Sequence, residues 1–160
     1  MRTNTRKLVL GTLLTMAVPF ALAPAQTPDP VIGTWVLNVV KSTYSPGPGP
    51  KSSTRTYVAT AKGYTFTSKG VDAAGKPTAS SFTTNLDGKY APMTGSASVD
   101  SIMVTRVDAN SAKSAQKKGN KVVINTTRVV SKDGKTLTAT TIGTDAAGKP
   151  TRNVEVFDKK

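Results

Sequence analysis

The chain of 160 residues contains no histidine and no cysteine. These absences remove the commonest general base, the thiolate nucleophile and the usual zinc ligands from its available chemistry. They also exclude disulfide bonds and a lipid-bearing cysteine. Carboxylates are scarce, since nine Asp and Glu residues stand against 22 Lys and Arg. We therefore expect no catalytic residue, no metal site and no cofactor, so the protein is not predicted to be an enzyme.

Most of the few acidic residues occupy predicted turns, where an aspartate side chain bonds its own backbone. These residues are Asp72, Asp87, Asp108, Asp133 and Asp145, and only Glu155 lies within a predicted strand. The repeated DAAGK turn offers one carboxylate and then a lysine, which does not match the alternating oxygen ligands of a calcium loop. An enzyme would need two or more loop carboxylates converging in one pocket.

Long apolar runs are absent except at the N-terminus. There the basic residues Arg2, Arg6 and Lys7 precede an apolar segment at 8–23, and small residues follow at Ala23-Pro24-Ala25. This order is typical of a secretory signal peptide, and the segment falls short of the about 20 residues of a membrane-spanning helix. We predict a signal peptide at 1–25, cleaved after Ala25, and one domain at 26–160. The mature protein is then an exported bacterial protein, periplasmic or extracellular, that does not span a membrane.

Acidic residues are too few to balance the basic ones. Cleavage removes three of the 22 basic residues and none of the nine acidic ones, so the mature net charge is +10. The densest basic group surrounds the turn KKGN and consists of Lys113, Lys117, Lys118 and Lys121. The lysines are otherwise scattered, and export removes nucleic acids as partners. A solvated basic hairpin is the simpler interpretation, and attraction to an anionic envelope surface or an acidic ligand is the alternative.

Helical periodicity is also missing, whereas alternation of apolar and polar residues recurs. It is clearest at 54–60, 64–70, 135–143 and 152–158, between clusters of Gly, Asp, Asn and Pro. Such segments are typical of strands joined by short turns. The fold class is therefore all-β, an antiparallel up-and-down meander. Closure of the meander into a barrel of eight to ten strands would remove its exposed edges.

One part of the chain is repeated. GVDAAGKPT at 70–78 returns as GTDAAGKPT at 143–151, and the same offset places 53–82 on 126–155. Each copy is expected to contain three strands, so the barrel contains an internal three-strand repeat. In both copies Asp can cap the turn, Gly can supply a positive φ, and Pro can begin the next strand. A motif present twice favours a reused hairpin over a unique active site.

The first predicted strand contains Gly33-Thr34-Trp35. With the export signal, the chain length and the meander, this motif resembles the start of the lipocalin-like, or calycin, β-barrels. The resemblance implies that Trp35 packs across one end of the barrel and closes it, and that Gly33 allows close backbone approach. It also implies an arginine stacked on the tryptophan, for which Arg128 and Arg152 are the candidates.

Candidate ligand-binding residues combine aromatic, aliphatic and basic side chains. They are Tyr57, Phe66, Phe82, Ile124, Arg55, Arg106 and Arg128. Alternation places Arg55 with Tyr57 and Arg128 with Ile124, and leaves open which face is interior. Inward arginines would need an acid or a hydrogen-bond partner and would anchor an anionic ligand head. Between the two arrangements, we favour arginines that face solvent on the outer surface.

The calycin resemblance implies non-covalent binding of a small hydrophobic or anionic amphiphilic molecule in the barrel, without catalysis. The alternative is a secreted protein-binding or envelope-associated module, such as an inhibitor, acting through basic loops with a filled barrel. An interior cavity on the order of a few hundred cubic ångströms would favour the first over the second.

Overall fold

The computed structural model describes residues 29–145 and 147–160, and within them the chain forms eleven strands and no helix. The strands are β1 (Gly33–Leu37), β2 (Thr43–Ser45), β3 (Ser52–Ala59), β4 (Tyr64–Val71), β5 (Pro77–Thr84), β6 (Asp87–Thr94), β7 (Ser101–Arg106), β8 (Ser111–Lys118), β9 (Lys121–Val130), β10 (Thr136–Thr144) and β11 (Pro150–Lys159). The predicted signal peptide, 1–25, lies outside the described residues. No helix in the described part of the chain is long and apolar enough to cross a membrane.

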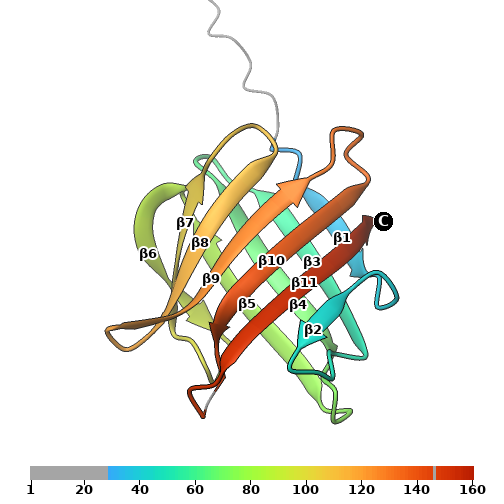
Figure 1. Ribbon diagram of the computed structural model, residues 1–160. Coiled ribbons are helices and arrows are strands. Elements are labelled where there is room, and N and C mark those ends of the chain that lie inside the picture. Colours follow the sequence, from blue (N-terminus) through green and yellow to red (C-terminus); the bar gives the residue numbers. More distant parts are fainter. Residues whose placement is uncertain (1–28, 146) are drawn as a thin grey trace, which may run out of the picture.

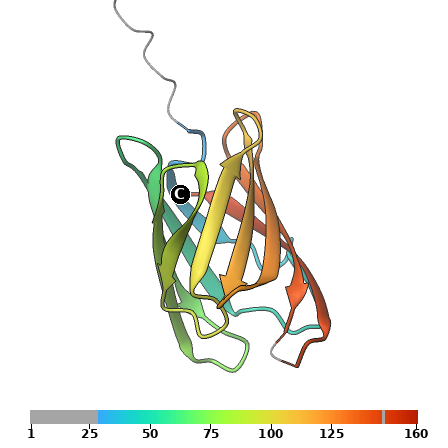
Figure 2. The same ribbon diagram turned by 90° about the vertical axis from the view of Figure 1, so that its left-hand side faces the viewer.

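The strands close into a barrel (Figures 1 and 2). From β3 to β11 each strand pairs antiparallel with its successor, and β1 joins the ends by pairing with both β3 and β11. The ring therefore contains ten strands, because β2 pairs with β11 alone. The prediction of an all-β meander closed into a barrel of eight to ten strands is confirmed. Within the described residues each strand of the ring has a paired neighbour on both sides, and the β5–β6 pairing is the shortest, with Ser81 opposite Thr94 and Phe82 opposite Met93.

The two copies of the repeat correspond to β3–β5 and β9–β11. The DAAGKP turns of the two copies, between β4 and β5 and between β10 and β11, lie at the same end of the barrel, at the bottom of Figure 1. This end is called here the repeat-loop end. In one turn the Asp72 carboxylate accepts a hydrogen bond of 2.8 Å from the Lys76 amide, and in the other Asp145 accepts one of 2.9 Å from the Lys149 amide. Gly75 has φ of 89°. The prediction of a reused, Asp-capped hairpin is confirmed.

The opposite end, called here the Trp35 end, is packed with apolar side chains. Trp35, Val31, Leu137 and Phe157 are completely buried there and belong to one cluster. The indole N–H of Trp35 donates a hydrogen bond of 2.7 Å to the Val31 carbonyl, so the buried ring leaves no donor unpaired. The described residues before β1 thus fold against the indole, an arrangement that fits the predicted closing role of Trp35.

A lysine, and not an arginine, lies over the tryptophan. The ammonium of Lys159 is 5.1 Å from the centre of the Trp35 ring, because these residues are paired directly across β1 and β11. The expectation that Arg128 or Arg152 fills this position was wrong. Arg152 is paired with Ser45 in β2 and exposed, and Arg128 lies over two tyrosines.

The backbone conformation explains the need for a glycine at the start of β1. Gly33 has φ of 131°, and a Cβ atom there would lie 3.0 Å from the Lys159 side chain. Other residues rarely adopt this φ, so glycine satisfies both the backbone and the close approach. The atoms that approach Gly33 belong to the Lys159 side chain, so the close backbone approach expected at Gly33 stays a prediction.

We predict that Trp35→Ala destabilises the barrel by about 3–5 kcal/mol, the usual cost of truncating a buried aromatic residue. The melting temperature should fall by roughly 10 °C or more. Ligand affinity should change little, because Trp35 does not line the cavity described below. Thermal denaturation and calorimetric titration test both statements, and an unchanged melting temperature would contradict the closing role.

Candidate functional site

A cavity of about 250 Å³ occupies the interior of the barrel. Nine successive strands, β3 to β11, contribute side chains to its lining. The cavity is partly open to solvent, so a molecule can enter it from outside the barrel. It is bounded by the aromatic cluster of the Trp35 end, which includes Tyr57 and Tyr64.

Six of the seven predicted ligand-binding residues line this cavity: Arg55, Tyr57, Phe66, Phe82, Ile124 and Arg128. Arg106 does not line it and lies at the Trp35 end with a side chain that is 40% exposed. The role of these seven residues in ligand binding is still a prediction, whereas the structure defines their positions. The lining also includes polar residues that the sequence did not single out, such as Gln116 and Asn153.

One wall of the cavity is apolar. It comes from β4 to β7 and consists of Tyr64, Phe66, Phe82, Met93, Ile102 and Val104. The rings of Phe66 and Phe82 are stacked, with centroids 4.8 Å apart and planes inclined by 27°. Two serines, Ser68 and Ser80, interrupt this wall toward the repeat-loop end.

The other wall is largely polar. It comes from β8 to β11 and contains Ser114, Gln116, Thr126, Arg128, Thr141, Asn153 and Glu155, with Ala112, Ile124 and Ala139 as its apolar members. In a ring of ten strands, members five positions apart lie opposite each other, as β4 and β9 do. The apolar and polar walls therefore face each other across the cavity.

Arg55 points inward and forms an ion pair. Its guanidinium donates a hydrogen bond of 2.5 Å to Glu155 and lies 4.2 Å from the centre of the Phe157 ring. Burial acts to lower the pKa of Arg55, but Glu155, Tyr57 and Tyr44 together more than offset this, and the pKa is raised. The guanidinium therefore stays charged.

Arg128 also points inward, but its charge is less well compensated. The residue is 9% exposed and donates a hydrogen bond of 3.1 Å to the Tyr64 hydroxyl. Its guanidinium carbon lies 5.3 Å and 5.4 Å from the centres of the Tyr57 and Tyr64 rings. For Arg55 and Arg128, the expectation that the arginines face solvent was wrong, because each finds polar and aromatic partners inside the barrel.

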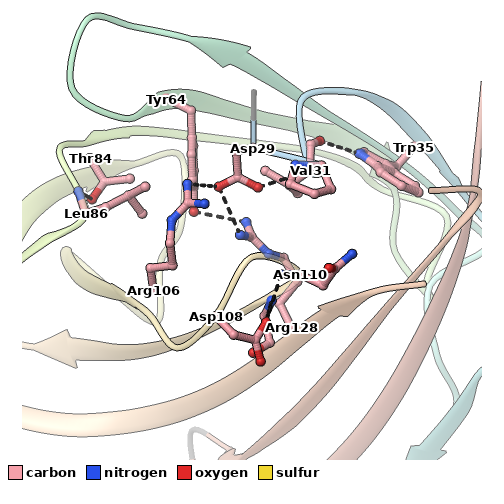
Figure 3. A network of polar contacts seen from close by, with 12 residues as sticks. Asp29, Val31, Trp35, Tyr64, Thr84, Leu86, Arg106, Asp108, Asn110 and Arg128 are labelled. Carbon is pink, nitrogen blue, oxygen red and sulfur yellow. Dashed lines mark hydrogen bonds and ion pairs between the residues drawn. The ribbon is translucent and has the colours of Figure 1, made fainter. Parts of the chain in front are cut away.

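The nearest carboxylate to Arg128 is already bound elsewhere. Figure 3 shows the side chains of Arg106 and Arg128 approaching Asp29 from different strands. Arg106 donates to Asp29 at 2.6 Å, and the Val31 amide donates to it at 3.0 Å. A nitrogen of Arg128 lies 3.9 Å from the same carboxylate, beyond hydrogen-bond distance.

The interior consequently has an excess of positive charge. Around the cavity, Arg55, Arg106 and Arg128 are grouped with the two carboxylates Glu155 and Asp29, which leaves one positive charge of this group uncompensated, and Lys113 adds a further cation to the lining. The Nε atoms of Arg55 and Arg128 are buried without a hydrogen-bond partner. Unpaired buried donors are costly and attract an acceptor, so the arrangement favours an anionic group in the cavity.

Sequence analysis did not identify Glu155 and Asp29 as partners of these arginines. Glu155 carried a signal, since it is the acidic residue that lies within a predicted strand, on the same face as the buried Phe157. Asp29 carried none, because it precedes the first strand and reaches the site only after the chain folds over the Trp35 end. Within the described residues no cluster of three or more potential metal ligands is present.

The phenol beside Arg128 supports a pH-dependent prediction. Burial raises the pKa of Tyr64 to about 12, although the Arg128 charge opposes this rise. Between about pH 10 and 12 the unfolded chain loses this proton while the folded protein keeps it. The free energy of unfolding should therefore fall as pH rises through this window. Urea denaturation at several alkaline pH values should show a shallower decline for Tyr64→Phe than for the wild type, and equal slopes would contradict the assignment.

The chain was compared with known proteins. No family model matches the sequence, and no curated protein matches it. Among solved structures, the chain is similar to the crystal structure of zebrafish ileal bile acid-binding protein complexed with cholic acid. The TM-score is 0.46 at 12% sequence identity, with 82% of this chain and 99% of that chain covered.

Proposed function

We propose that this protein binds a small amphiphilic molecule non-covalently in the cavity of its barrel, without catalysis. The observation that carries the proposal is the cavity of about 250 Å³, lined by apolar residues on one side and polar residues on the other. Binding sites for small molecules combine an apolar lining with a few well-placed polar groups. A side-chain-filled core would have favoured the alternative, a secreted protein-binding module acting through basic loops.

The size of the cavity restricts the ligand. A cavity of about 150 Å³ holds benzene, so one of about 250 Å³ has room for roughly ten non-hydrogen atoms. This is smaller than the pockets of about 300–1,000 Å³ that hold drug-sized molecules. The part of the ligand that is held inside the barrel is therefore compact.

Catalysis is not part of the proposal because the lining lacks an acid–base pair. Among the cavity-lining residues, all in the described part of the chain, Glu155 is the one carboxylate, and Arg55 holds it in an ion pair. The sequence provides no histidine or cysteine to replace it.

The proposed setting is the periplasm or the extracellular space. The basic and apolar segments at 1–25 support export, and the mature net charge of +10 favours an anionic partner. Lys76, Lys118, Lys121 and Lys149 flank turns at the repeat-loop end. These charges would attract an anionic ligand, or an anionic envelope surface, toward that end of the barrel.

Native mass spectrometry of the protein purified from the export compartment of its own host tests the function. We expect a co-purified molecule of low mass that dissociates on denaturation. Ala139→Phe should abolish this adduct, because Ala139 is buried in the cavity lining and a phenyl ring would fill the space. Val129→Phe on the adjacent strand is the control, since Val129 is 44% exposed. An adduct that survives Ala139→Phe in a folded protein would place the ligand outside the barrel.

A further inference from the structure

We infer that the cavity is specific for a single-ring carboxylate with a hydroxyl group, and that Arg128 holds the carboxylate. This inference rests on the proposed function and names the ligand class of the same site. It follows from three features of the lining: a cluster of aromatic rings, a facing row of hydroxyl and amide groups, and one undercompensated guanidinium.

The aromatic surface favours a ring over a chain. Phe66 and Phe82 are stacked against each other, and the Tyr57 ring packs edge-on against Phe66 with centroids 5.1 Å apart. These rings are fixed by their neighbours and form part of the cavity lining. A ligand ring gains about 0.5–1.5 kcal/mol from aromatic packing beyond the area that it buries, and an alkyl chain does not.

The facing wall favours polar groups on the ring. Gln116, Thr126, Thr141 and Asn153 line the cavity from four adjacent strands, β8 to β11. The hydroxyls of Thr126 and Thr141 lie 3.0 Å apart and form a hydrogen-bonded pair. A hydroxyl on the ligand ring can bond to this row, whereas a hydrocarbon chain would leave desolvated polar groups without partners.

Arg128, and not Arg55, is the anchor for the carboxylate. Arg55 already donates to Glu155 at 2.5 Å, so its charge is neutralised. Among the described residues, Arg128 reaches one acceptor within hydrogen-bond distance, the neutral Tyr64 hydroxyl, and its buried Nε has no partner there. A guanidinium with free donors binds a carboxylate through two parallel hydrogen bonds.

Arg106 acts as a positioning residue for this anchor. It holds the Asp29 carboxylate at 2.6 Å, and the nitrogen of Arg128 remains 3.9 Å from that group. Without Arg106, Asp29 would be free to pair with Arg128 and compete with the ligand. Arg106 therefore keeps the Arg128 site open to an external anion without contacting the ligand.

Isothermal titration calorimetry with the mature chain tests the ligand class. The probes are 4-hydroxybenzoate, octanoate, which matches it in charge and in number of non-hydrogen atoms, and 4-hydroxybenzamide, its neutral analogue. We expect 4-hydroxybenzoate to bind at least about tenfold more tightly than either of the others, a difference of about 1.4 kcal/mol. Equal or tighter binding of octanoate would overturn the ring preference, and equal binding of the amide would overturn the anion site.

Three variants test the role of Arg128. Arg128→Gln should remove the preference for the acid over the amide. Asp29→Asn keeps an oxygen acceptor for the Val31 amide and removes the competing charge, so it should tighten 4-hydroxybenzoate binding by roughly threefold. Arg106→Gln should weaken binding while leaving the amide affinity unchanged. Arg152→Gln is the control for net charge, because Arg152 is exposed outside the cavity lining.

The two proposals fail in different ways. A co-purified small molecule that is lost in Ala139→Phe, together with no preference for 4-hydroxybenzoate, would overturn the ligand class and leave barrel binding intact. Unchanged 4-hydroxybenzoate affinity in Asp29→Asn and Arg106→Gln would overturn the role of Arg128, even if Arg128→Gln fails to fold.

Discussion

Closure of ten strands into one ring is the constraint on which the rest of this structure depends. The diameter of a barrel grows with the number of its strands, and about eight strands already leave an interior just wide enough to fill with side chains. With ten strands, the inward residues of this chain leave about 250 Å³ unfilled. Strand number thus provides the room for a cavity, and the size of the inward side chains decides where the barrel is filled, as at the Trp35 end, and where it stays open.

Closure itself depends on a short seam. β1 pairs with β11 through Trp35, Val36 and Leu37, and its neighbour β3 carries Arg55. Beyond Leu37 the chain leaves the barrel wall, and β2 resumes the pairing with β11 at Val154. Arg55 and Glu155 belong to the two strands that flank β1, so their ion pair links β3 to β11 across this seam. The indole of Trp35 stabilises this seam by packing, and the ion pair between Arg55 and Glu155 stabilises it by charge.

Strand positions followed from sequence because period-two alternation, turn residues and the repeat are local signals. The orientation of the arginines did not follow, because Arg55 and Tyr57 alternate together and composition alone places arginine outside. The deciding residue, Glu155, lies 100 positions away in the chain. Similarly, Lys159 reaches Trp35 through the β1–β11 pairing, which no local pattern specifies. The calycin resemblance implied an arginine at this position, so it did not indicate Lys159. Whether the barrel is filled depends on which side chains point inward after closure and on their size, and alternation alone left the inward face open.

The repeat explains why two equivalent arginines differ. Arg55 and Arg128 occupy the same position in the two copies, and Glu155 in the second copy corresponds to Phe82 in the first. On one side of the ring only β1 separates the copies, so Arg55 of the first copy reaches Glu155 of the second. On the other side three strands, β6 to β8, separate them, and the residue equivalent to Glu155 there is an uncharged phenylalanine. Because one strand separates the two copies on one side of the ring and three strands on the other, Glu155 neutralises Arg55 but does not reach Arg128. Arg128 is thus the guanidinium that we propose attracts an anionic ligand.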